Sequence, residues 1–250
     1  MEITQASDSL HLVSTRHVNW VIYDGPDGLL LIDAGYVGQR DLLERSIREL
    51  GHGPDEIAAA LVTHGHVDHI GGLPWLATRY GTPVYSSERE AAHIRREFLE
   101  QAGPPDIVRN LTRPGVLTWS VQIVGLMRGR AGLGVPSAEP IDEATARTLP
   151  GSPRPIVVTG HTTGHTAYYF EAERVLVAGD AITTEHATSR VQGPQLLPEF
   201  FHHDPSQALA SLNELADLEV DTVLPGHGPP TPGPMPTVIA QIRDRHPRYR

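Results

Sequence analysis

The chain of 250 residues contains no cysteine. It can therefore form no disulfide, offer no thiolate to a metal and use no cysteine nucleophile, although this absence does not define a compartment. No apolar run is long enough for a transmembrane helix, and residues 1–10 lack the basic and apolar regions of a signal peptide. We therefore expect a cytoplasmic protein without a membrane partner.

Lysine is also absent, so all 20 basic residues are arginines, against 30 acidic residues and a formal net charge of −10. Proteins that bind nucleic acid normally carry a basic face, and this charge balance argues against a nucleic-acid partner. A chain of this length can bury a sizeable core. We expect a single domain, residues 1–250, that acts on a small-molecule substrate. The oligomeric state stays open, a homodimer included.

Apolar runs at strand spacing alternate with segments at helical spacing, which favours a layered α/β fold. The clearest signal is a hairpin formed by residues 19–23 and 29–33 around a glycine-containing connection. Further strands are expected at 60–62, 83–85, 156–159, 167–170, 175–178 and 220–224, and helices at 39–50, 73–80, 87–101, 206–218 and 237–245. The proline- and glycine-broken stretch of about 86–155 is interpreted as an insertion packed over the functional site.

One segment carries an unusual density of metal-binding side chains. His64, His66, Asp68 and His69 lie within six positions, directly after the predicted strand at 60–62. Imidazole and carboxylate donors suit zinc, iron or manganese rather than calcium or magnesium. In an extended segment His64 and His66 point to the same side, whereas a helix starting near Asp68 would turn Asp68 and His69 to another. The segment therefore predicts ligands for two neighbouring metal positions.

Three further candidate donors follow predicted strands, each beside a glycine that permits a sharp turn: His165, Asp180 and His227. Residues at strand ends are the usual source of site groups in layered α/β folds. His161 precedes His165 by four residues. We interpret it as a surface or packing histidine, with support of a ligand as the alternative.

Five motifs in this order resemble those of the metallo-β-lactamase superfamily: Leu31-Ile32-Asp33-Ala34-Gly35, the segment from Thr63 to Gly72, Gly164-His165-Thr166, Gly179-Asp180 and Pro225-Gly226-His227-Gly228. The resemblance covers about residues 18–230 and is closest to the glyoxalase II and lactonase-like branch. It implies an αββα four-layer sandwich with a helical insertion at about 86–155.

The resemblance also implies two bound divalent metal ions, zinc first, with iron or manganese as alternatives. Its ligand set would be His64, His66 and His165 at one metal, Asp68, His69 and His227 at the other, and Asp180 between them. A metal-bridging hydroxide would attack the substrate, and Asp68 or Asp180 would act as the catalytic proton carrier. Asp33 would support a ligand histidine from behind.

Departures from the family patterns narrow the activity. Without cysteine, the thiolate ligand of the common zinc β-lactamases is missing, and His66 stands where flavodiiron proteins carry a glutamate. The absence of lysine weakens a glyoxalase II assignment, and the tyrosine that follows the bridging aspartate in some lactonases is replaced by Ala181. The sequence therefore predicts a dinuclear metal-dependent hydrolase of a small ester, thioester or lactone.

Three alternatives stay open. One is a mononuclear iron oxidoreductase similar to persulfide dioxygenases, which would use His64, His165 or its neighbour, and Asp180. A second is a phosphodiesterase or nuclease, and a third is a binding protein without catalysis.

Candidate substrate-pocket residues come from the stretch after Asp180, namely His186, Arg190, Phe200 and His202. Arg190 would pair with a substrate carboxylate, or else be a solvated arginine. In the insertion, Trp119, Leu126 and Met127 would form either an apolar wall over the site or simply the core of the insertion.

Overall fold

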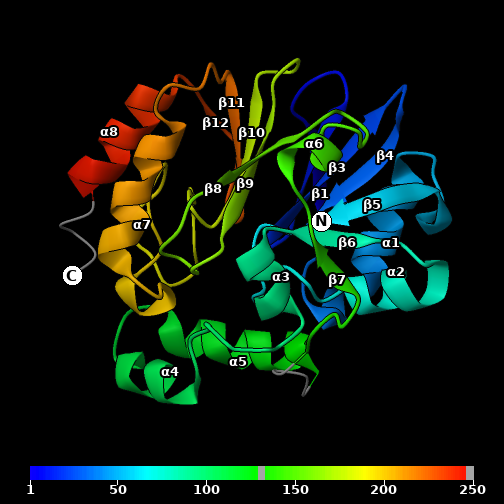
Figure 1. Ribbon diagram of the computed structural model, residues 1–250. Coiled ribbons are helices and arrows are strands. Elements are labelled where there is room, and N and C mark those ends of the chain that lie inside the picture. Colours follow the sequence, from blue (N-terminus) through cyan, green and yellow to red (C-terminus); the bar gives the residue numbers. More distant parts are fainter. Residues whose placement is uncertain (129–132, 246–250) are drawn as a thin grey trace.

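The computed structural model describes residues 1–128 and 133–245. Two β-sheets pack face to face (Figure 1). The first sheet has seven strands in sequence order, namely β1 (Glu2–Gln5), β2 (Leu10–Ser14), β3 (Asn19–Gly25), β4 (Gly28–Ile32), β5 (Ile57–Leu61), β6 (Val84–Ser86) and β7 (Ala138–Pro140). The second has the order β12 (Thr231–Pro232), β11 (Thr222–Pro225), β10 (Val175–Gly179), β9 (Thr166–Phe170), β8 (Arg154–Val157).

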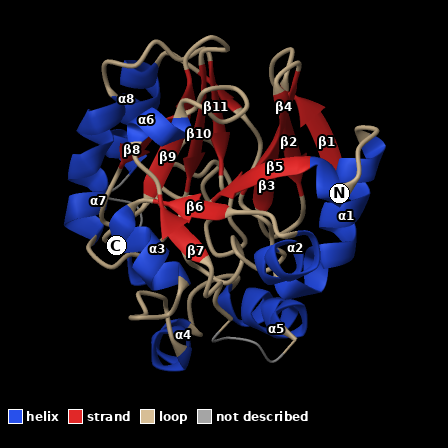
Figure 2. Cartoon of the chain, turned by 45° about the vertical axis from the view of Figure 1, so that its right-hand side comes forward, coloured by secondary structure: helices blue, strands red, loops and turns tan. Residues whose placement is uncertain are grey.

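Helices cover the outer face of each sheet (Figures 1 and 2). The first sheet packs against α1 (Arg40–Glu49) and α2 (Leu73–Tyr80), and the second against α7 (Pro205–Ser211) and α8 (Met235–Arg245). Between β6 and β8 the chain forms α3 (Glu88–Ile94), α4 (Pro104–Asn110), α5 (Val116–Met127) and the short α6 (Glu143–Ala146).

The alternation of side chains along β3 explains the layering, because successive residues of a strand point to opposite faces. Trp20 and Ile22 pack outward in the same core as Leu43 of α1. Tyr23 points inward and stacks on Phe170 of β9, with ring centroids 5.6 Å apart. A third core lies between the second sheet and α7 and α8. The predicted αββα sandwich is confirmed.

Strand direction brings the functional loops together. Strands β4, β5 and β6 run parallel, as do β10 and β11. The loops that leave β4, β5, β10 and β11 therefore emerge at one edge of the sandwich. The two sheets are joined there, since the Asn19 N–H donates to the Gly226 carbonyl at 2.8 Å.

The structure corrects the predicted insertion. β7 lies inside the stretch of 86–155, yet it pairs with β6 and completes the first sheet. What projects from the sandwich is α4 and α5, which lie together at one end of the molecule (Figure 1). The helix predicted over 87–101 ends at Ile94, because Arg96 takes a positive φ of 65° and its guanidinium donates to the carbonyls of Gly65 and Leu133.

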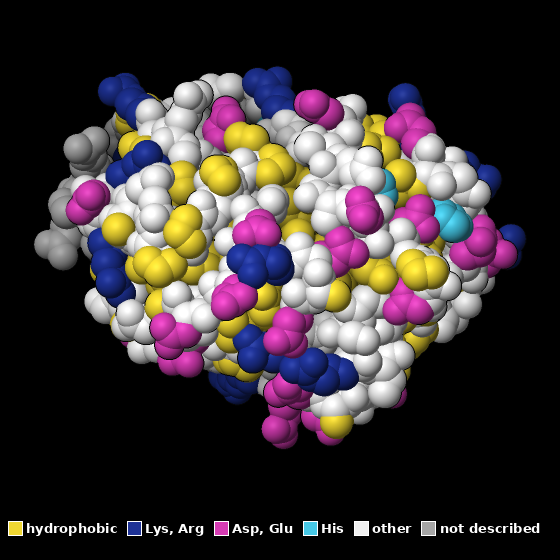
Figure 3. Space-filling model, turned by 90° about the horizontal axis from the view of Figure 1, so that it is seen from above, with side chains coloured by type: hydrophobic (Ala, Val, Ile, Leu, Met, Phe, Trp, Pro, Cys, Tyr) yellow, Lys and Arg dark blue, Asp and Glu magenta, His cyan; other side chains and the backbone are white. Residues whose placement is uncertain are grey.

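The hairpin of β1 and β2 was not predicted: β1 is largely polar, although β2 carries the buried Leu10, Leu12 and Val13. The helix considered near Asp68 is wrong, because the chain there forms a turn and α2 starts at Leu73. Across the end of the molecule that faces away from α4 and α5, arginines and acidic side chains are interspersed (Figure 3). Among the described residues, no helix is long and apolar enough to cross a membrane.

Candidate metal centre

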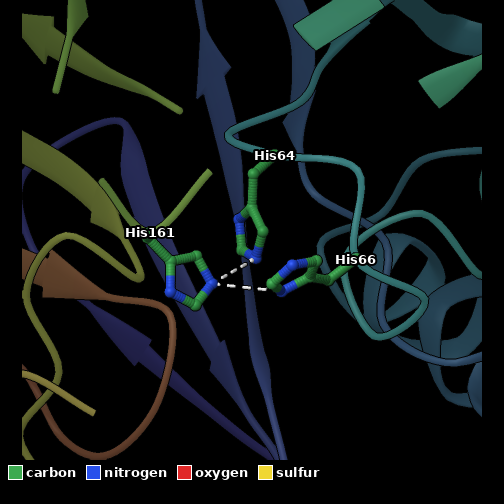
Figure 4. A group of neighbouring side chains, drawn as sticks. All are labelled: His64, His66 and His161. Atoms are coloured by element: carbon green, nitrogen blue, oxygen red, sulfur yellow. Dashed lines mark hydrogen bonds between the residues drawn. The ribbon is translucent and has the colours of Figure 1, made fainter. Parts of the chain in front are cut away.

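Three histidine rings converge on one point at the edge of the sandwich (Figure 4). His161 Nε2 lies 3.1 Å from His64 Nε2 and 3.1 Å from His66 Nδ1. Donors held tetrahedrally at about 2.0–2.1 Å from one zinc ion would lie about 3.3 Å apart. Two of the three nitrogen pairs therefore stand close to the spacing that a single bound ion requires, and all three nitrogens lie within 4.8 Å of one another.

A second group adjoins the first. His69 Nε2 and His227 Nε2 lie 3.9 Å and 3.7 Å from Asp68 Oδ2. Asp180 stands between the groups, because its carboxylate is 3.4 Å from His161 Nε2 on one side and 3.2 Å from His227 Nε2 on the other. The side chains thus form two adjoining sets of donors that share one carboxylate.

The donor set fits divalent metal ions. His69 Nε2 and Asp180 Oδ1 are buried and have no hydrogen-bond partner among the described residues. A buried polar atom without a partner costs free energy, and these two atoms face one another at 3.5 Å. Nitrogen and carboxylate donors in this number are compatible with a bound divalent cation.

The pKa values of the histidines are shifted in different directions in the two groups of donors. Burial, together with the neighbouring rings, holds the pKa of His64 and of His161 well below the ordinary value and lowers the pKa of His66 to about 4. These rings are therefore neutral, as metal ligands must be. Burial also opposes the charged form of His69, but the carboxylates of Asp180, Asp33 and Asp68 together outweigh it and raise the pKa of that ring.

His165 does not lie where the sequence placed it. Its Nε2 accepts the Asp180 backbone N–H at 3.1 Å, and its own carbonyl accepts from Val158 N–H at 2.8 Å. Because His165 directly precedes β9, this pairing with the chain beyond β8 holds its ring behind Asp180. His161, at the tip of the same turn, reaches the position beside His64 and His66 instead.

Asp33 supports the centre from the loop after β4. Its carboxylate accepts from the Thr63 N–H at 2.8 Å and the Thr63 hydroxyl at 2.7 Å, and it lies 2.8 Å from His69 Nδ1. This contact orients the ring so that Nε2 faces the other donors. Asp33 itself is not among the residues that converge on either metal position.

Glu90 of α3 forms a buried anchor that sequence reasoning missed. Its carboxylate accepts from Gly65 N–H at 2.7 Å and from the Thr162 hydroxyl at 2.6 Å, and lies 2.5 Å from His93 Nδ1. Burial alone would raise the pKa of Glu90, but the bond to His93 and the other donors lower it. The sequence signal for this pair is the three-residue spacing of Glu90 and His93, which places both side chains on the same side of a helix.

Two glycines allow the loops to approach so closely. Gly179 has a φ of +50°, and a side chain there would meet Thr63. A side chain at Gly226 would collide with the Asp180 carboxylate. The predicted glycine-flanked turns at Asp180 and His227 therefore have a steric reason.

The family model of the metallo-beta-lactamase superfamily matches residues 13–227. The chain belongs to this superfamily. A probable metallo-hydrolase of Bacillus subtilis, YflN, is 28% identical over 215 residues, which cover 83% of this chain and 78% of that protein. This relative supports the assignment of the chain as a metal-dependent hydrolase.

Solved structures share the fold. A metallo-beta-lactamase family protein from Thermus thermophilus, TTHA1429, superimposes with a TM-score of 0.65 at 24% identity, covering 96% of this chain and 80% of that one.

A shorter match in sequence is to ribonuclease J of Synechocystis, which is 31% identical over 108 residues that cover 40% of this chain and 17% of that protein.

A cavity of about 440 Å³ opens onto the metal centre of this superfamily member. Both Trp119 and Met127 line it, as does His186. Leu126 packs against the adjoining apolar cluster. Burial lowers the pKa of His186 to about 3, so its ring is a neutral part of the wall.

The remaining pocket candidates lie elsewhere. Arg190 is exposed and Phe200 packs on Phe201, and neither lines this cavity. His202 Nδ1 lies 3.2 Å from His161 Nδ1, so His202 contacts a converging ring from behind. A buried tyrosine that the sequence did not single out, Tyr36, lines the cavity beside Asp68.

Proposed function

We propose that this protein is a two-metal hydrolase that cleaves a small ester, thioester or lactone. The observation that carries the proposal is the pair of adjoining donor groups that share Asp180 and open onto a substrate-sized cavity. A structural zinc site would be closed and satisfied by four ligands, whereas seven side chains converge here.

In the proposed centre, His64, His66 and His161 hold one ion and Asp68, His69 and His227 the other, with Asp180 shared. His161 thus takes the place first given to His165. Two divalent ions in such a site lower the pKa of a bound water and polarise the substrate carbonyl. We propose zinc as the native metal, with iron or manganese as alternatives, since the donor set accepts all three.

Two side chains around the cavity are proposed to assist the reaction, one by proton transfer and one by hydrogen bonding. Asp68 is the better proton carrier, because its side chain is 16% exposed, whereas that of Asp180, which also lines the cavity, is 3% exposed. Burial, together with Asp68 and Asp180, raises the pKa of Tyr36 well above its ordinary value. The Tyr36 hydroxyl therefore stays protonated and provides a hydrogen-bond donor at the cavity wall.

Location and partners are part of the proposal. We propose a cytoplasmic enzyme that binds a small molecule and neither nucleic acid nor membrane, as a monomer or a homodimer. The net charge of −10 supports this, because a polyanion would be repelled.

The test combines metal analysis with turnover of aryl esters, thioesters and lactones. We expect about two metals per chain, hydrolysis of at least one class, and loss of activity in Asp180→Asn. Asp41→Asn is the matched control, because Asp41 lies on α1 with a mostly exposed side chain. Two metals without turnover of any class would refute the proposed substrates. One iron per chain with oxygen consumption would instead support the oxidoreductase, for which His64, His161 and Asp180 also lie close together.

The similarity to ribonuclease J favours a second candidate, a nuclease. Such an activity would show nucleic-acid binding that weakens steeply as salt is raised. Cleavage of single-stranded RNA or DNA at the same metal centre, lost in Asp180→Asn, would favour it over the ester hydrolase.

A further inference from the structure

The cavity at the metal centre is largely apolar, and its titratable lining residues belong to the metal centre or adjoin it. Its walls are built largely from the segment that leaves α3 and from α4 and α5, including Leu99, Ile107, Val108, Ile123 and Val124. Its only charged lining residues in the described chain are Asp68 and Asp180, both in the proposed metal centre. Across residues 1–128 and 133–245 no arginine lines it, so these walls offer no counter-charge to an anionic substrate group.

A second cavity, of about 610 Å³, meets the first at Trp119, His186 and His227. Its remaining lining is mostly polar and includes Arg16, Gln122 and Glu185. A substrate held at His227 can therefore extend in two directions that differ in polarity. The apolar part of such a substrate is expected to lie on the α4–α5 side, because burial of apolar surface is favourable only where that surface leaves water for apolar walls.

Several walls of the apolar cavity are left open to water. Val108 and Val124 are 65% and 61% exposed although both line it. Val121, one turn before Val124 on α5, is 68% exposed and does not line the cavity. An apolar ligand bound in this cavity would cover these exposed apolar side chains and remove them from water.

We propose that the substrate is an ester or thioester with an apolar alkyl chain, and that this chain lies in the cavity formed by α4 and α5. The inference rests on the proposed hydrolase and names its substrate class. In the reaction a water oxygen bonds to the carbonyl carbon and the bond to the leaving oxygen or sulfur breaks. One proton of that water goes to the leaving group, and the other passes to solvent as the acid is released as carboxylate.

The first test is a series of p-nitrophenyl esters from acetate to octanoate, kept below their aggregation concentrations. Burial of each methylene predicts a rise in kcat/KM of about threefold to fourfold until the cavity is filled. Val124→Glu places a charge in the wall and is expected to lower the octanoate-to-acetate ratio of kcat/KM by about tenfold. Val121→Glu is the matched control on the same helix and leaves that ratio unchanged.

The second test measures binding without turnover, by calorimetric titration with butanamide and octanamide. We expect octanamide to bind more tightly to the wild type, and Val124→Glu to remove the difference. Ester hydrolysis that is flat with chain length, with equal binding of both amides, would overturn the proposed chain site and leave the hydrolase standing. An equal loss in Val121→Glu would also overturn it. Chain-dependent amide binding without hydrolysis of any ester, thioester or lactone would support the site and refute the hydrolase.

Discussion

Substitution of Glu90 tests whether a buried carboxylate outside the metal centre holds it together. Gly65, whose N–H donates to Glu90, lies between two of the converging histidines, and Thr162, whose hydroxyl also donates, follows His161. Glu90 thus joins the loop after β5 to the turn between β8 and β9. Glu90→Ala would release both loops and leave their donors buried without an acceptor.

The magnitude follows from the number and kind of bonds lost. Breaking a buried, charge-assisted network by removal of one partner costs about 3–5 kcal/mol. Glu90→Gln keeps an oxygen for the Gly65 N–H and His93, and its amide N–H₂ can donate to the Thr162 hydroxyl. It therefore loses the charge but little of the geometry, and we expect a cost of about 1–2 kcal/mol.

Urea unfolding gives the free energy, and competition with a chelator gives the zinc affinity. We expect Glu90→Ala to lower the affinity by about 10–100-fold, as loss of an outer support typically does, and Glu90→Gln to restore most of it. Glu97→Ala is the control, because Glu97 is exposed and pairs with Arg95 just beyond α3. An Ala variant within about 1 kcal/mol of the wild type, with unchanged zinc affinity, would refute the anchoring role of Glu90.

Two further predictions concern the histidines. His161→Gln is expected to reduce the metal content below two per chain, whereas His165→Gln retains it, and elemental analysis of both variants decides between the two rings. The bond to Glu56, with Asp24 on the other side, raises the pKa of His52 despite partial burial. The stabilisation by His52 is then fully present below its unfolded pKa of about 6.5 and is lost as pH rises through the raised pKa. The stability difference between wild type and His52→Gln should accordingly shrink between about pH 5.5 and about pH 8.5 in urea unfolding, and an equal difference at both pH values would contradict the pairing.

The layered fold was predictable because its signals are local. Residues 19–23 and 29–33 are apolar runs, typical of strands buried on both faces, and the glycine-containing connection between them predicts their pairing as a hairpin. Which side chains face α1 and which face the second sheet is seen only in the structure. The hairpin of β1 and β2 lacks this signal, since β1 is largely exposed and is held mainly by its pairing with β2. Its formation depends on a partner strand that periodicity alone does not reveal.

Some of the converging histidines were predictable from local sequence, whereas one was identified only from the folded structure. His64, His66 and His69 were predictable because their spacing alone marks a metal site. His161 and His165 both lie next to glycine in one short turn, so the sequence offers no local reason to prefer either. The choice is made by backbone pairing across the turn: the bond from Val158 fixes His165 at the start of β9 and leaves His161 free to reach the centre.

The apolar cavity is still less predictable from local sequence, because its walls come from the segment after α3, from α4 and α5 and from the stretch after β10. The predictions for Arg190 and Phe200 failed there, since nearness to Asp180 in sequence does not determine which side chains face the cavity.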